Sequence, residues 1–108
     1  MERLKPRVKI PDRVTPGEVM EVRTLISHPM ETGYRRDVYG EKIPRHIINR
    51  LSCEYGGQIV FEAEFGPGIA ANPYLSFFVR AESSGPMKLT WEDDRGNRRE
   101  LIKQVNVA

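Results

Sequence analysis

Residues 50–65 read RLSCEYGGQIVFEAEF and decide the fold of this chain. Apolar and polar residues alternate on both sides of Gly56-Gly57, which is the pattern of a β-strand with one buried face. Two glycines between alternating runs indicate a two-residue β-hairpin, because its central positions need positive φ. The side chains expected on the inner face are Leu51, Cys53, Tyr55, Ile59, Phe61, Ala63 and Phe65.

The same alternation recurs along the rest of the chain. It predicts strands at residues 7–10, 18–26, 47–55, 59–65, 74–82, 87–92 and 98–107. Residues 69–73 are expected to cross between strands and to hold one short helical turn. Seven short strands with no amphipathic helix predict an all-β fold, an immunoglobulin-like β-sandwich of antiparallel strands. Its core is expected to hold Phe61, Phe77, Leu89 and Trp91.

Length and charge exclude several classes of protein. The 108 residues predict a single domain spanning 1–108. With 17 basic and 15 acidic residues the net charge is +2, which is not the basic profile of a nucleic-acid binder. No apolar run approaches the roughly 20 residues of a membrane span. One cysteine allows no internal disulfide, and the first residues lack a signal-peptide core, so composition alone indicates the cytoplasm.

One connection is much longer than the others. It covers residues 27–45, between two predicted strands, and it opens with His28-Pro29. Proline has no N–H and restricts the residue before it, so the strand must end there. A long loop among tight turns is usually kept for function, because ordering it costs entropy.

Aromatic side chains on the outer face are a second unusual feature. Tyr74 and Phe78 fall on the face opposite Phe77, and Val60 falls opposite Phe61. Such a cluster indicates a protein interface. The alternative is that the long loop folds over this face and covers it, and the sequence leaves both explanations open.

Candidate chemical groups are few. Cys53 lies on the predicted inner face, so we expect a buried and inert thiol. His28, Met30, His46 and Cys53 are the residue types of a blue-copper site, but neither His nor Met closely follows Cys53 as such a site requires. The acidic residues 92–94 fit a solvated hairpin turn, and no nucleophile elbow or phosphate loop is present. We therefore expect no catalytic, metal-binding or cofactor-binding residue.

Three motifs in order resemble a known family. Residues 24–33 read TLISHPMETG, residues 69–77 read IAANPYLSF, and residues 91–94 read WEDD before a hairpin and a last strand. Together they resemble SoxZ, a subunit of the Sox sulfur-oxidation system.

The resemblance implies a non-catalytic role. A SoxZ-like chain would form the heterodimeric SoxYZ carrier with SoxY, whose cysteine on a glycine-rich C-terminal arm bears the sulfur substrate while other Sox enzymes process it. Residues 104–108 of this chain hold neither cysteine nor glycine. The resemblance also implies a periplasmic location, reached by export together with a partner that carries the signal peptide. The competing hypothesis is a periplasmic β-sandwich protein that binds metal or does redox chemistry.

The partner-binding residues are expected in the long connection and on the outer aromatic face. Tyr, Phe, Met and Arg are enriched in protein interfaces. Without its partner, the isolated chain is expected to self-associate through the same surface. The predicted partner-binding set is His28, Met30, Arg35, Arg36, Arg45, Tyr74 and Phe78.

Overall fold

The computed structural model describes residues 5–108. Within them the chain forms seven strands, and the described residues include no helix long and apolar enough to cross a membrane. The strands are β1 (Arg7–Lys9), β2 (Val19–Leu25), β3 (Ile48–Tyr55), β4 (Gln58–Glu64), β5 (Tyr74–Arg80), β6 (Gly85–Asp93) and β7 (Arg98–Val105).

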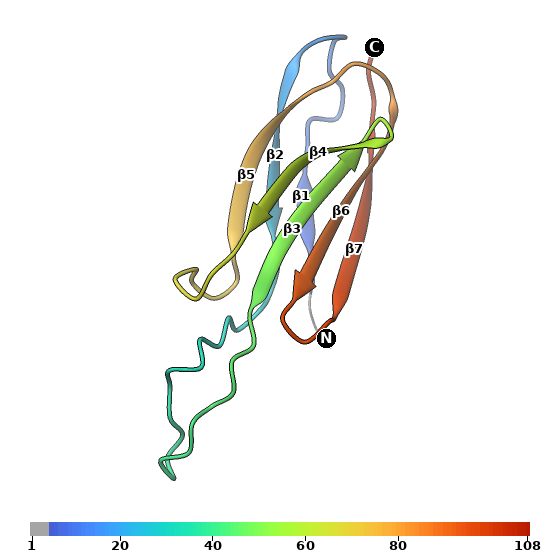
Figure 1. The fold of residues 1–108 in the computed structure, drawn as a ribbon. Coiled ribbons are helices and arrows are strands. Elements are labelled where there is room, and N and C mark those ends of the chain that lie inside the picture. Colours follow the sequence, from blue (N-terminus) through green and yellow to red (C-terminus); the bar gives the residue numbers. More distant parts are fainter. Residues whose placement is uncertain (1–4) are drawn as a thin grey trace.

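The strands make two antiparallel sheets packed face to face (Figure 1). One sheet has the order β1-β2-β5 and the other β4-β3-β6-β7, so β4 and β7 are the edges of the larger sheet. The β3–β4 hairpin turns at Gly56 and Gly57, whose φ angles are 66° and 79°. Both values need the left-handed region that glycine adopts without steric cost, so the hairpin prediction is confirmed.

The strand boundaries differ from prediction by a few residues. The largest difference is β6, which begins at Gly85 and continues to Asp93 because it pairs with both β3 and β7. Residues 69–73 contain bends and no helical turn, so that detail was wrong. Asn72 instead adopts a positive φ of 53°.

One hydrophobic core lies between the sheets. Trp91 is 1% exposed, Leu89 and Cys53 are completely buried, and Phe77 is nearly so. Phe61 is half-buried and stacks flat on Phe77 across the two sheets, with ring centroids 4.0 Å apart. The predicted core of Phe61, Phe77, Leu89 and Trp91 is therefore confirmed. Ile59, which was also expected on the inner face, is instead 54% exposed, because the β3–β4 register shifts between Cys53 and Glu54.

The long connection forms an arm, which we define as residues 27–46. It leaves the sandwich beyond β2 and returns into β3 as an extended two-stranded excursion (Figure 1). Isolated bridges join Glu31 to His46 and Arg36 to Lys42 along it. The arm gives the molecule an elongated outline of 58 × 21 × 20 Å. Because the arm points away from both sheets, the hypothesis that it covers the outer aromatic face is wrong.

Replacing Trp91 with alanine is expected to lower the free energy of unfolding by about 3–5 kcal/mol, because a large buried cavity would remain. Urea unfolding followed by far-UV circular dichroism measures this, since the variant has no tryptophan signal. Ile102 on β7 is 63% exposed, so Ile102→Ala serves as a control that should change stability by less than about 0.5 kcal/mol. Equal losses in the two variants would contradict the assignment of Trp91 to the core.

Candidate functional site: the arm, its base and the sheet faces

His28 fixes the first turn of the arm. Its ring is 2% exposed, and its Nδ1 accepts a hydrogen bond from the Met30 backbone N–H at 2.9 Å. The His28 backbone N–H donates to Asn72 Oδ1 at 2.9 Å, and the Asn72 N–H donates to the His28 carbonyl at 2.7 Å. These bonds hold Met30 and Asn72 at positive φ, which costs energy for residues with a side chain.

Met30 anchors the arm to the core. Its side chain is 5% exposed, and its Sδ accepts a hydrogen bond from the Ile48 N–H at 3.3 Å. Unbranched methionine fills irregular space between the arm and β3. His28 and Met30 therefore shape the base of the arm and present little surface to a partner.

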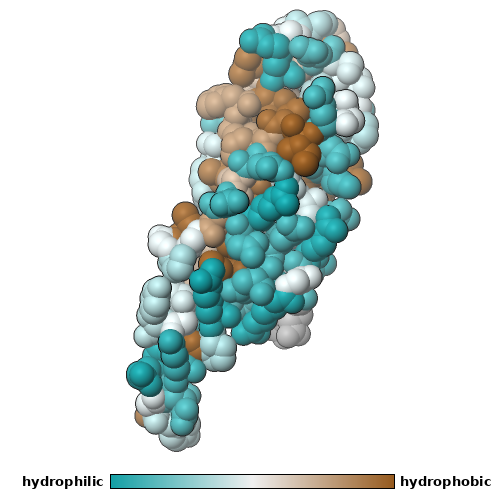
Figure 2. Space-filling view, viewed as in Figure 1, coloured by the Kyte–Doolittle hydropathy of each residue, from teal (hydrophilic) through white to brown (hydrophobic). Residues whose placement is uncertain are grey.

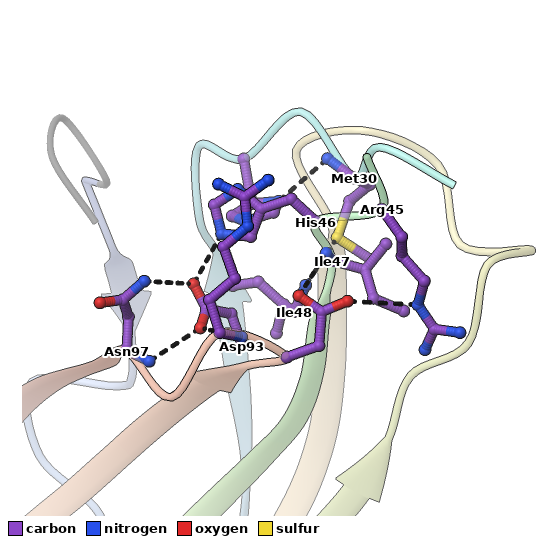
Figure 3. A network of polar contacts seen from close by, with 10 residues as sticks. Met30, Arg45, His46, Ile47, Ile48, Asp93 and Asn97 are labelled. Carbon is purple, nitrogen blue, oxygen red and sulfur yellow. Dashed lines mark hydrogen bonds and ion pairs between the residues drawn. The ribbon is translucent and has the colours of Figure 1, made fainter. Parts of the chain in front are cut away.

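Asp93 binds the returning segment of the arm through His46. Its carboxylate is fully buried at the end of β6 and accepts bonds from the Arg95 N–H at 3.0 Å and the Asn97 N–H at 2.8 Å. It also accepts from Asn97 Nδ2 at 3.0 Å and from His46 Nε2 at 2.7 Å (Figure 3). The prediction of a solvated acidic turn is wrong for Asp93, because the hairpin and His46 enclose it.

These hydrogen bonds determine the charge state of Asp93. Burial alone raises the pKa of its carboxyl group. Hydrogen bonds from His46, Asn97 and Arg95 outweigh burial and hold the pKa at about 2. Asp93 is therefore a carboxylate throughout the physiological range.

Asp94 adds a second attachment beside Asp93. Its backbone N–H donates to the Ile47 carbonyl at 3.1 Å, and its Oδ1 accepts from the Ile47 N–H at 3.3 Å. Its other oxygen pairs with Arg45 Nε at 3.2 Å. We call His28, Met30, His46, Asp93 and Asp94 the clasp of the arm.

The clasp brings together three groups that could in principle hold a metal ion. Ligand atoms of His28, His46 and Asp93 lie within 4.8 Å of one another. Sequence spacing missed this cluster because its members come from three distant segments. The sequence offers only a weak signal for this cluster: Asp93 and Asp94 directly follow a predicted strand, and each histidine lies next to the end of another.

The hydrogen bonding does not fit a metal. His28 Nδ1 uses its lone pair to accept the Met30 N–H, so the neutral ring carries its proton on Nε2 and has no lone pair left for an ion. The four donors to Asp93 occupy both of its oxygens, and one of them is His46. A metal would have to displace the bonds that hold the arm.

His28 is instead suited to remain neutral. Burial, and then the neighbouring His46, lower the pKa of its ring. Its Nε2 is buried and has no hydrogen-bond partner among residues 5–108, while the two imidazole rings lie edge to face at a centroid distance of 4.7 Å. A protonated His28 would place an unsolvated charge in this contact.

Cys53 has no access to a reaction partner. It is completely buried on β3, and burial raises the pKa of its thiol to about 12. A thiol needs a depressed pKa and exposure to act as a nucleophile. The predicted burial of Cys53 is confirmed.

The arginines predicted for partner binding form bonds within the arm and its base. Arg35 pairs with Glu31, Arg36 donates to the Gly40 carbonyl at 2.8 Å, and Arg45 reaches Asp94. All three stay largely exposed, so their charges face solvent as well. Their role in partner binding stays a prediction.

The two outer sheet faces differ in chemistry. Charged side chains cover the β4-β3-β6-β7 face, and Figure 2 shows it as hydrophilic except for a hydrophobic patch over β4. Its ion pairs join Arg50 to Glu62 and Glu92, Arg98 to Glu92 and Glu100, and Lys88 to Glu100. This face satisfies its own charges and is adapted to water.

The β1-β2-β5 face is more apolar. Tyr74 and Phe78 are 61% and 66% exposed, as the alternation predicted. Tyr74 lies opposite Leu25 on the neighbouring strand. Phe78 lines a groove at the β4–β5 edge with Ile59 and Val60, which joins it to the patch seen over β4. These exposed apolar side chains form a candidate interface.

A family comparison identifies the chain. Residues 8–103 match the model of the sulphur oxidation protein SoxZ. The chain belongs to the SoxZ family. The three motifs that carried the resemblance meet at the base of the arm, where His28, Asn72 and Asp93 come from one motif each.

Solved structures place this SoxZ-family chain among similar folds. A superoxide reductase (neelaredoxin) from Ignicoccus hospitalis is 19% identical with a TM-score of 0.74, covering 95% of this chain and 80% of that one. The sulfur carrier protein SoxY from Chlorobium limicola f thiosulfatophilum is 14% identical with a TM-score of 0.66, covering 95% and 78%. At such identities the likeness concerns the fold alone, and it confirms the predicted sandwich. A search of curated proteins gives no match.

The native Cys53 thiol is expected to resist alkylation and to react only when the chain unfolds, because it is buried and protonated at neutral pH. Cys53→Ala should lower the free energy of unfolding by about 1–2 kcal/mol through lost packing. Reaction with a thiol reagent in the presence and absence of urea tests the first statement. A native rate equal to that of free cysteine would contradict it.

Asp93 should make stability fall in acid. Its folded pKa of about 2 lies below the ordinary value of 3.8, so the unfolded chain takes up its proton first as the pH falls. The stabilisation, about 2 kcal/mol, is present above pH 4 and disappears between about pH 4 and pH 2. Urea unfolding of the parent and Asp93→Asn should therefore converge over that range.

Asp12 provides the matched control for this experiment, since it is exposed. The free energy of unfolding of Asp12→Asn should stay within about 0.5 kcal/mol of that of the parent, as for most surface changes. If the difference between the parent and Asp93→Asn also stays constant from pH 7 to pH 2, the buried carboxylate does not carry the stabilisation.

Proposed function

We propose that this chain is the non-catalytic subunit of a SoxYZ-type sulfur carrier. In this proposal it binds a SoxY subunit, whose cysteine carries the sulfur, and it presents the carrier to other Sox enzymes. The observation that carries the proposal is the family match over residues 8–103, nearly the whole chain. The buried Cys53 supports it, because this thiol is unsuited to carry sulfur itself.

The β1-β2-β5 face is the proposed SoxY interface. It offers exposed Leu25, Tyr74 and Phe78, while the opposite face pairs its own charges. Interface cores are depleted in charge and enriched in aromatic residues. The surrounding exposed cations are Arg7, Lys9, Arg23 and Arg80, with Glu21 as the acid among them. A partner surface with an apolar centre and carboxylates at its rim would complement this face.

The proposal also covers the assembly and its location, which are carried over from the resemblance to the family. The chain would form a heterodimer that buries well over about 1,000 Å². It would reach the periplasm by export with a partner that carries the signal peptide. Without that partner, the same apolar face would favour self-association, which sedimentation detects as a concentration-dependent mass.

A metal-binding or redox protein on the same sandwich is the second candidate. The proximity of His28, His46 and Asp93 favours it. The occupied lone pair of His28 Nδ1 and the four bonds to Asp93 argue against it. Elemental analysis of the purified chain distinguishes the two candidates.

Alanine substitution at Tyr74 or Phe78 should weaken binding to the purified SoxY subunit by about 2 kcal/mol each, if these side chains lie near the centre of the interface. Surface plasmon resonance measures the affinity and the association rate. Ile102→Ala removes an equally exposed apolar side chain from the opposite sheet and should bind like the parent. Arg23→Ala should mainly slow association and reduce its salt dependence.

The Arg35/Arg36 double alanine variant tests the arm in the same binding measurement. If this variant, Tyr74→Ala and Phe78→Ala all fold normally and bind SoxY as tightly and as fast as the parent, neither the sheet face nor the arm forms the interface.

A further inference from the structure

The outer end of the arm carries the most exposed apolar side chains described in residues 5–108. Val38 is 93% exposed, Tyr39 is 87% exposed and Tyr34 is 78% exposed. We call residues 37–41 the tip. Sequence reasoning placed the interface in His28, Met30 and three arginines of the arm and in two aromatic residues of the outer sheet face. It missed Val38 and Tyr39, although two apolar residues between Asp37 and Gly40 are unusual in an exposed turn.

The tip is an ordered turn. Asp37 Oδ1 accepts the backbone N–H groups of Tyr39 at 2.9 Å and Glu41 at 3.0 Å. The Asp37 N–H donates to the Glu41 carbonyl at 2.8 Å, and Gly40 takes the positive φ of 80° that closes the turn. All these bonds use the backbone and the Asp37 side chain. The side chains of Val38 and Tyr39 take no part in these bonds and face outward.

The rest of the arm holds the tip at a fixed distance from the sandwich. The Ile43 N–H donates to the Arg35 carbonyl at 2.9 Å, and Glu31 and His46 exchange two backbone bonds of 2.8 Å. Gly33 lies so close to Arg45 that an added Cβ would come within 3.0 Å of the arginine Cβ, which keeps the two segments in close contact. The clasp then fixes the base, so the tip is a pre-organised projection.

The surface area that the tip can bury indicates whether its partner would be permanent or transient. Val38 and Tyr39, even together with Tyr34 further along the arm, can bury only roughly 500 Å². A standard stable interface takes about 800 Å² from each partner, whereas transient encounters use less. The tip is therefore too small to hold a permanent subunit and suits a partner that binds and leaves.

The shape of the tip indicates what kind of surface the partner would have. A narrow projection with an apolar end fits a concave apolar pocket. Arg36 and Lys42 flank the tip and are balanced by Asp37 and Glu41 within it, so the apolar side chains and not a net charge would determine the fit.

We propose that the tip is a second docking surface, separate from the sheet face, that inserts Val38 and Tyr39 into a concave apolar pocket of an enzyme that visits the assembled carrier. The inference rests on the proposed function, because it takes the visiting partners to be Sox enzymes. It assigns the permanent partner to the β1-β2-β5 face and the transient partners to the tip.

The test uses the assembled heterodimer and each purified Sox enzyme of the same cell, one at a time, in surface plasmon resonance. The Val38→Ser/Tyr39→Ser double variant should bind at least one enzyme about tenfold or more weakly, as expected for an aromatic anchor. Its affinity for SoxY and its melting temperature should equal those of the parent. Glu41→Ser, a polar change on the same turn, should bind no more weakly than the parent.

The outcomes separate this inference from the proposed function. SoxY binding is measured first, without any enzyme, and failure of the parent to form the heterodimer overturns the proposed function. Given a heterodimer, the inference is overturned if the double variant binds every enzyme as tightly as the parent. It is also overturned if the parent heterodimer binds no enzyme, or if the double variant loses SoxY.

Discussion

The buried carboxylate of Asp93 is the constraint on which the arm depends. A charge removed from water is tolerated only where donors surround it, and here the hairpin backbone, Asn97 and His46 supply them. Because His46 ends the arm, the same bonds that stabilise the charge also orient the arm. On the other side, His28 joins Met30 and Asn72 and completes the attachment.

The sandwich separates three tasks in space. The ion-paired face of the larger sheet is adapted to water, and the apolar face of the smaller sheet is available for a large contact. The arm extends beyond both faces (Figure 1). This separation explains how a chain of 108 residues could hold a permanent partner and still meet others.

Local patterns were sufficient to predict the strands, the Gly56-Gly57 turn and the inner position of Cys53, because alternation is a property of neighbouring residues. The clasp could not be predicted in this way. The pairing of β3 with β6 and the path of the arm bring His28, His46 and Asp93 together. The local spacing of residues in the sequence predicts neither of these. The sequence predicts a solvated Asp93, because acids in hairpin turns usually face water. Its burial follows from a tertiary contact.

The burial of the Cys53 thiol affects how this chain would behave beside proteins that carry reactive sulfur. Thiol–disulfide exchange requires an accessible thiolate, and a thiol with a pKa of about 12 inside the core supplies none. Persulfides, polysulfides and mixed disulfides can therefore form and break around the folded chain without transferring sulfur to it. Beside the proposed SoxY partner, whose cysteine would carry the sulfur, an inert Cys53 would leave that cysteine as the one attachment site for sulfur.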